Sequence, residues 1–193
     1  MFKDRFFPRR EGGVNVRQVY LEVLLQKALS LAQHGNSSAA LNVANHVGNE
    51  VPGFSFTKDG LDSFVNHARF QFLLGEVYAR SGQIEPAKTH WHEAVHLGAS
   101  DDPVDLVFAM RAARQLATFD ADAWRARLER SLERFSSESD DEEGPNALRL
   151  YAKGLLLQAL GREAEAQVPW KQVPLLPDRG LAHYLVRVAR KNS

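Results

Sequence analysis

The sequence has 193 residues, with 24 Lys and Arg against 24 Asp and Glu, so its formal net charge is zero. That balance argues against nucleic-acid binding, which needs an excess of basic charge on one face. The absence of cysteine excludes disulfide frameworks, thiolate metal sites and cysteine nucleophiles. No apolar run resembles a secretory signal or has the length of a membrane span, so we expect a soluble, cytoplasmic protein with no membrane partner.

The N-terminal part of the chain changes character at residue 16. Residues 1–15 are rich in Arg and Phe, and we predict an arm there rather than a helix. From Val16 onward, apolar residues recur at helical spacing, which predicts a first helix pair over about 16–48. Gly35 lies between the two helices of this pair, where glycine tolerates the left-handed conformation that ends a helix. A long loop is expected to follow, up to Leu61.

A motif of two glycines, an alanine and a tryptophan then occurs twice. The copies fall in predicted helix pairs at about 61–98 and 145–173, and each residue of the second copy lies 79 positions after its counterpart. The first copy is Gly75, Gly82, Ala87 and Trp91, and the second is Gly154, Gly161, Ala166 and Trp170. Both read as an amphipathic helix, a short glycine turn and a second helix, and such internal repetition indicates a repeat architecture.

Between the two copies, helical periodicity predicts a further pair over about 103–135, preceded by Asp101 and Asp102 as a helix start. Arginines cluster in this pair, but glutamates lie among them, so we expect salt bridges within the helix rather than a basic binding face. These arginines are Arg111, Arg114, Arg127, Arg130 and Arg134, and the glutamates are Glu129 and Glu133. Residues 136–144 are acidic and lack apolar side chains, which predicts a linker. A short helix over about 180–190 would cap the chain, and residues 16–193 would form one domain.

The repeated motif resembles the tetratricopeptide repeat family. The resemblance implies an all-α, right-handed solenoid of about four helix pairs with a C-terminal capping helix. It also implies that the mid-helix glycine of each copy, Gly75 or Gly154, permits a close helix crossing. The small partner across that crossing is then Ala87 or Ala166, respectively. The further family positions are Ala28, Gly35, Ala40, Tyr78 and Ala94. Gln71 departs from the family, which usually has Trp early in the first helix.

Helix-pair solenoids expose a concave surface lined by the first helix of each pair. By resemblance, we expect a non-catalytic interaction module that holds a protein or peptide partner in this groove and needs no cofactor. The groove-facing positions are Glu22, Leu25, Leu29, Arg69, Phe72, Glu76, Arg80, Tyr151, Leu155 and Gln158. Ordinary core packing is the alternative for Leu25, Phe72 and Leu155. The alternative function is that of a repeat region belonging to a larger enzyme or assembly protein.

One segment matches the H-E-x-x-H pattern of zinc metallopeptidases, namely His92-Glu93-Ala94-Val95-His96. In that pattern two histidines on one helix face bind zinc and the glutamate acts as general base. A catalytic zinc site needs a third protein ligand, and the sequence nominates none. In the repeat frame Trp91 and Ala94 point into the helix pair, which turns both histidines outward. A metallopeptidase is therefore a remote alternative, and an adventitious metal site at His92 and His96, without biological meaning, is a less remote one. We predict neither a metal site with a biological role nor catalysis.

Overall fold

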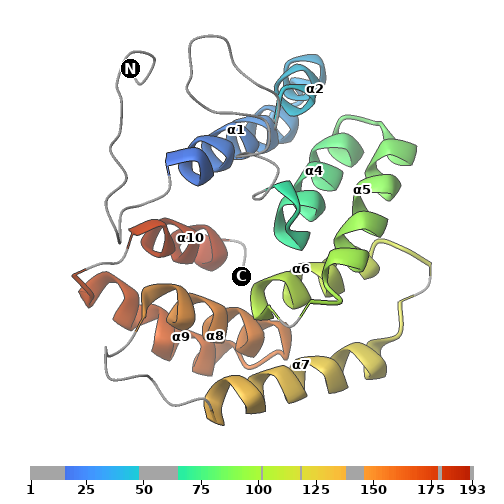
Figure 1. The fold of residues 1–193 in the computed structure, drawn as a ribbon. Coiled ribbons are helices and arrows are strands. Elements are labelled where there is room, and N and C mark those ends of the chain that lie inside the picture. The colour runs from blue at the N-terminus through green and yellow to red at the C-terminus, as the bar shows by residue number, and fades with distance from the viewer. Residues whose placement is uncertain are drawn as a thin grey trace. The chain divides into compact units, whose positions relative to one another are not determined.

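The structure is a computed structural model that describes residues 16–47, 65–100, 102–117, 119–137, 146–177 and 180–191 (Figure 1). Within these residues every regular element is a helix and no strand occurs, which confirms the predicted all-α class. The predicted arm at 1–15, the whole of the predicted loop from 48 to 61, and most of the acidic linker lie outside the described residues. Residues 136 and 137 of the predicted linker belong instead to a helix.

The chain divides into two compact units, residues 1–97 and 98–193. The described helices of the first unit are α1 (Val16–Gln33), α2 (Ser37–Asn45), α4 (Ala68–Arg80) and α5 (Ile84–Leu97). Those of the second are α6 (Pro103–Ala113), α7 (Ala121–Ser137), α8 (Ala147–Ala159), α9 (Glu163–Gln172) and α10 (Gly180–Lys191), with a 3₁₀ turn, η1 (Val173–Leu175), after α9.

Both units follow one packing scheme, in which helices that are consecutive in sequence pair. In the first unit α1 packs on α2 and α4 on α5, and α4 also contacts both α1 and α2. In the second unit α6 contacts α7 and α8 packs on α9, and α8 also contacts both α6 and α7. The first helix of the second pair therefore contacts both helices of the preceding pair. In the second unit α10 also packs on α8.

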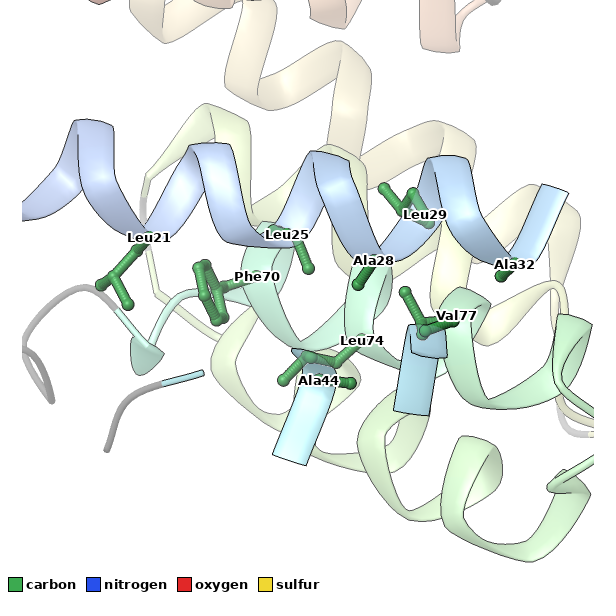
Figure 2. Close-up of a cluster of buried hydrophobic side chains, with 10 residues drawn as sticks. Leu21, Leu25, Ala28, Leu29, Ala32, Ala44, Phe70, Leu74 and Val77 are labelled. Atoms are coloured by element: carbon green, nitrogen blue, oxygen red, sulfur yellow. The ribbon is translucent and has the colours of Figure 1, made fainter. Parts of the chain in front are cut away.

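The core of the first unit lies between α1, α2 and α4 (Figure 2). The buried positions on α1 recur at helical spacing, and α4 contributes Phe70, Leu74 and Val77. Those on α1 are Leu21, Leu25, Ala28, Leu29 and Ala32. Full burial of a leucine or phenylalanine side chain stabilises a fold by about 1.5–3 kcal/mol, so this cluster is the main source of stability for the first pair.

In the second unit the central element is α8. Its residues 154–157 are all buried, a pattern that occurs where a helix is covered on several sides. The neighbours that cover it are α6, α7, α9, η1 and α10. Trp170 and Val173, which follow in α9 and η1, have no exposed surface. The second unit is therefore built around one apolar helix rather than around a single amphipathic interface.

Three of the four pairs turn through the same glycine motif. Gly35, Gly82 and Gly161 have φ values of +77°, +82° and +77°, a region that costs L-residues free energy because of their Cβ atoms. The amide after each glycine donates to the carbonyl five residues back, at 2.9, 2.8 and 2.9 Å respectively, which is the hydrogen bond that closes a Schellman motif. In the remaining pair Asp120 caps the start of α7 instead, through hydrogen bonds of 3.1 and 3.0 Å from two backbone amides.

The mid-helix glycines make room for tryptophan, which corrects the partner assigned from the sequence. A Cβ atom on Gly154 would lie 2.0 Å from Nε1 of Trp170, and one on Gly75 would lie 2.5 Å from Nε1 of Trp91. The predicted close crossing is present in both pairs, but the group that occupies it is an indole ring and not the methyl group of Ala87 or Ala166. Both alanines are nevertheless fully buried.

The two indoles differ in one hydrogen bond. Nε1 of Trp170 donates to the carbonyl oxygen of Tyr151 at 3.1 Å. Nε1 of Trp91 is also buried, but it has no hydrogen-bond partner among the described residues. The same packing motif thus includes a hydrogen bond from the indole in the second unit, whereas in the first unit the indole contributes van der Waals contacts only among the described residues.

We predict that Ala87→Leu and Ala166→Leu each destabilise the protein by about 1–3 kcal/mol, because a larger side chain at a fully buried site must push two helices apart. Ala39→Leu is the matched control, since Ala39 is exposed on α2 and the same change there should stay within about 0.5 kcal/mol. Urea unfolding of the three variants measures the difference. Equal midpoints for the control and the buried variants would contradict the assigned packing.

We also predict that Gly154→Ala destabilises the protein more than Gly75→Ala does. Both methyl groups collide with an indole, but only at Gly154 must the displaced ring break a hydrogen bond, which typically contributes about 0.5–1.5 kcal/mol. Alanine has a helix propensity about 1 kcal/mol more favourable than that of glycine. This gain is the same at both sites, so it does not affect the difference in unfolding free energy between the two variants. Free energies of unfolding from parallel denaturant titrations test the order, and the reverse order would be inconsistent with the indole geometry.

Candidate functional site

A buried ion pair joins the first helices of the two pairs in the first unit. Glu22 on α1 is 4% exposed, and the side chain of Arg69 on α4 is 13% exposed. The guanidinium group donates to both carboxylate oxygens, at 2.5 and 2.7 Å, and Gln26 donates to the same carboxylate at 3.0 Å. Removal of one partner from a buried pair typically costs about 3–5 kcal/mol, because the other charge is left without compensation. This pair therefore ties α1 to α4.

Half of the residues predicted to line a groove lie in the core, and this corrects their assignment. Leu25 and Leu155 have no exposed surface, which is the core-packing alternative considered for them. Leu29 packs in the same cluster as Leu25 (Figure 2), and Tyr151 is 3% exposed beneath Trp170. Together with Glu22, these residues face the neighbouring helix of the same unit, because the first helices of successive pairs pack on one another.

The accessible groove positions form a short row on α4, which we call the α4 stripe: Phe72, Glu76 and Arg80. Their spacing of four residues places them on one helix face. Phe72 is half-buried, Glu76 is 19% exposed and Arg80 is 47% exposed. Arg80 donates to Glu76 at 3.1 Å, an exposed helical pair that contributes only a few tenths of a kcal/mol. The α4 stripe thus combines the aromatic ring of Phe72 with the carboxylate of Glu76 and the guanidinium group of Arg80, all of which a ligand can reach.

The remaining predicted groove residue, Gln158, lies in the other unit. It is half-buried on α8 and accepts a hydrogen bond of 2.9 Å from Arg111 on α6. As with Glu22 and Arg69, the contact joins the first helices of two successive pairs. The structure therefore brings Phe72, Glu76 and Arg80 together on one helix, and it places Gln158 in a separate interhelical contact of the second unit.

A polar network that the sequence did not reveal connects α2, α4 and α5. His90 on α5 stacks on Tyr78, with ring centroids 5.1 Å apart and planes at 17°. The hydroxyl of Tyr78 donates to Asn45 on α2 at 2.6 Å. On its other side, Nδ1 of His90 lies 2.7 Å from Oε1 of Gln71. The residue that departs from the repeat pattern, Gln71, is therefore matched by a histidine on the paired helix.

The orientation of Gln71 determines the tautomer of His90. Its amide nitrogen donates to the carbonyl oxygen of Val65 at 3.1 Å, and a carbonyl can only accept. The amide oxygen of Gln71 must then face the imidazole, so Nδ1 of His90 carries the proton and donates. Burial lowers the pKa of His90 below its ordinary value, and the nearby carboxylate of Glu93 offsets part of this effect.

We predict that acidification destabilises the first unit through His90. Because the folded state lowers the pKa of His90, this contribution to stability is complete above the unfolded value of about 6.5 and is lost as pH falls through the folded value. Between pH 7 and pH 5 the wild type should lose more stability than His90→Gln, which cannot titrate. His34→Gln is the control, because His34 is exposed and bonds only its own helix. Parallel pH profiles for wild type and His90→Gln would refute this role.

The H-E-x-x-H segment lies on α5 with its histidines outward. Trp91 and Ala94 are buried, while His92, Glu93 and His96 are exposed. In the part of the chain that the structure describes, no three His, Cys, Asp or Glu side chains gather in a way that could hold a metal ion. The arrangement needed for a catalytic zinc, three protein ligands beside a substrate cleft, is not found in these residues.

Several arginines of the second unit stack on aromatic rings, which the sequence did not lead us to expect. A salt bridge within the helix, as expected, is also present, but it joins Glu129 to Arg125 at 3.2 Å. Arg127 lies 4.6 Å from the ring centre of Trp124 and donates to the carbonyl oxygen of Gly98 at 2.8 Å. Arg111 lies 4.9 Å from the ring centre of Phe108 in the same way. In both cases the arginine follows the aromatic by three residues, a spacing that places two side chains side by side on a helix. That spacing was the signal available in the sequence.

No helix of the described residues is both long enough and apolar enough to cross a lipid bilayer.

No protein-family model matches the chain, and neither a curated protein nor a solved structure matches it significantly. We therefore infer function from the side chains of this chain and their contacts.

Proposed function

We propose that the chain is a tetratricopeptide-like helix-pair protein that binds a protein or peptide partner and has no catalysis of its own. Two observations support the helix-pair construction. The Gly–Trp crossing recurs in both units, and three pairs turn through the same left-handed glycine. In both units the first helix of the second pair also contacts both helices of the preceding pair, as expected when helix pairs stack in a solenoid.

The observation that carries the binding role is the α4 stripe. Phe72 offers an apolar ring, and Glu76 and Arg80 offer charges of both signs within two turns of the same face. Aromatic and arginine side chains are the types that contribute most free energy at protein interfaces. Since the Glu76–Arg80 pair is weak and exposed, a partner can replace it with its own charged groups at little cost.

The Glu22–Arg69 pair lies beside this row and would act as a fixed support. Arg69 is three residues before Phe72 on the same helix, and its guanidinium group is already engaged by two carboxylate oxygens. The backbone that bears the α4 stripe is therefore held against α1 before any ligand binds. A surface ordered in advance loses less conformational entropy on association, which favours affinity.

We predict that Phe72→Ala together with Arg80→Ala weakens partner binding by at least about 2 kcal/mol, as expected for truncation of interface anchors. The full-length protein would serve as bait in extract of its native host, and each captured protein would then be purified and titrated against the wild type and the variants. The matched control is Lys88→Ala together with Glu93→Ala, since both of these residues are exposed on α5.

A partner that binds the wild type and the α5 control with equal affinity, but loses affinity for the α4 variant, would support the proposal. Thermal melting of both variants shows whether they fold equally well, which separates lost contacts from lost structure. If every saturable partner binds the α4 variant as tightly as the wild type, the α4 stripe is not the binding surface.

A further inference from the structure

The outer face of α5 presents two histidines with free rings. His92 and His96 are exposed, one helical turn apart, and among the described residues neither takes part in a hydrogen bond or an ion pair. Other histidines of the first unit are engaged. Nδ1 of His34 lies 2.7 Å from the carbonyl oxygen of Ser30, and Nδ1 of His46 lies 2.6 Å from that of Asn42. The α5 pair therefore has all four of its ring nitrogens available to a ligand from solvent.

The sequence alone led us to expect no metal site here, but from the exposure of both rings we propose that His92 and His96 form an open, two-imidazole site for a divalent transition-metal ion of the zinc, nickel and copper class. Side chains four residues apart on a helix are neighbours, with Cβ atoms roughly 5–6 Å apart, so two imidazoles can converge on one ion. No third His, Cys, Asp or Glu joins them among the described residues, so water completes the coordination of the ion. This site differs from a peptidase centre, where three protein ligands hold the zinc.

The packing of α5 prepares the pair for binding. Trp91 and Ala94, which are buried beside and between the two histidines, fix the rotation of the helix. Two residues before His92, the hydrogen bond between His90 and Gln71 attaches α5 to α4. The backbone is thus ordered before the ion arrives, and only two side chains must adopt fixed rotamers. Binding does not depend on the α4 stripe, which lies on another helix.

The donor set also determines which ions bind. Imidazole nitrogen suits copper, nickel and zinc, whereas magnesium and calcium prefer oxygen ligands. For one site of fixed donors, affinity generally rises from nickel to copper and falls again at zinc. The structure therefore assigns copper as the tightest of the three ions and magnesium as a non-ligand.

The test is isothermal titration of the untagged, chelator-treated full chain with the chlorides of Cu²⁺, Ni²⁺, Zn²⁺ and Mg²⁺. We expect one ion per chain for the first three and no binding of Mg²⁺. His92→Ala and His96→Ala should each weaken binding at least about tenfold, since loss of even an outer-sphere partner of a metal ligand typically costs about 10–100-fold. Glu93→Gln and His34→Ala are the controls and should bind like the wild type.

Three results would overturn the proposal. The first is the absence of copper binding by the wild type, and the second is unchanged affinity in the His92→Ala/His96→Ala double variant, which would mean an adventitious ion only. The third is a loss of affinity in Glu93→Gln as large as that in His92→Ala, which would make the carboxylate a ligand. All of these residues are exposed, so circular dichroism should show the same helicity for every variant.

Discussion

Contact between an indole ring and a glycine backbone is the interaction on which both units depend. Each tryptophan lies where a single Cβ atom on the opposing helix would overlap it, so the two helices approach as closely as a bare Cα allows. Glycine within a helix costs about 1 kcal/mol relative to alanine, and burial of most of a tryptophan side chain more than offsets that cost. The distance between the paired helices, and with it the placement of every side chain on their outer faces, follows from this contact.

Polar contacts then determine how one pair lies on the next. In the first unit the buried Glu22–Arg69 pair and the network through Tyr78 and His90 join α1, α2, α4 and α5. In the second unit a hydrogen bond between Arg111 and Gln158 joins the equivalent first helices. The first unit contains His90, whose pKa is lowered by burial, whereas the second unit is built around the buried apolar residues of α8.

The features that could be predicted from the sequence are those with a local cause. A glycine at a helix end and an aspartate before a helix act on backbone groups only a few residues away, so Gly35, Gly82 and Gly161 were recognisable. The partner of Gly154 was not, because repeat spacing indicates that two helices cross but does not indicate which side chain occupies the crossing. Residues such as Leu25 and Tyr151 were assigned to a groove by resemblance to the repeat family. That resemblance concerns single helix pairs and cannot show that a neighbouring helix covers these residues. The pairing of Gln71 with His90 joins positions 19 residues apart, and no pattern within a single helix predicts it.

The unpaired indole of Trp91 has a consequence for how the protein can be observed. Trp91 in the first unit and Trp170 in the second occupy equivalent slots, yet only one donates a hydrogen bond, so the two fluorophores sit in chemically different surroundings. The third tryptophan, Trp124, lies under the guanidinium group of Arg127 and can be replaced by phenylalanine without loss of the ring on which that group stacks. The Trp124→Phe variant would thus carry one intrinsic optical reporter in each unit. Their emission during unfolding can reveal whether the two halves of the chain melt together or in sequence.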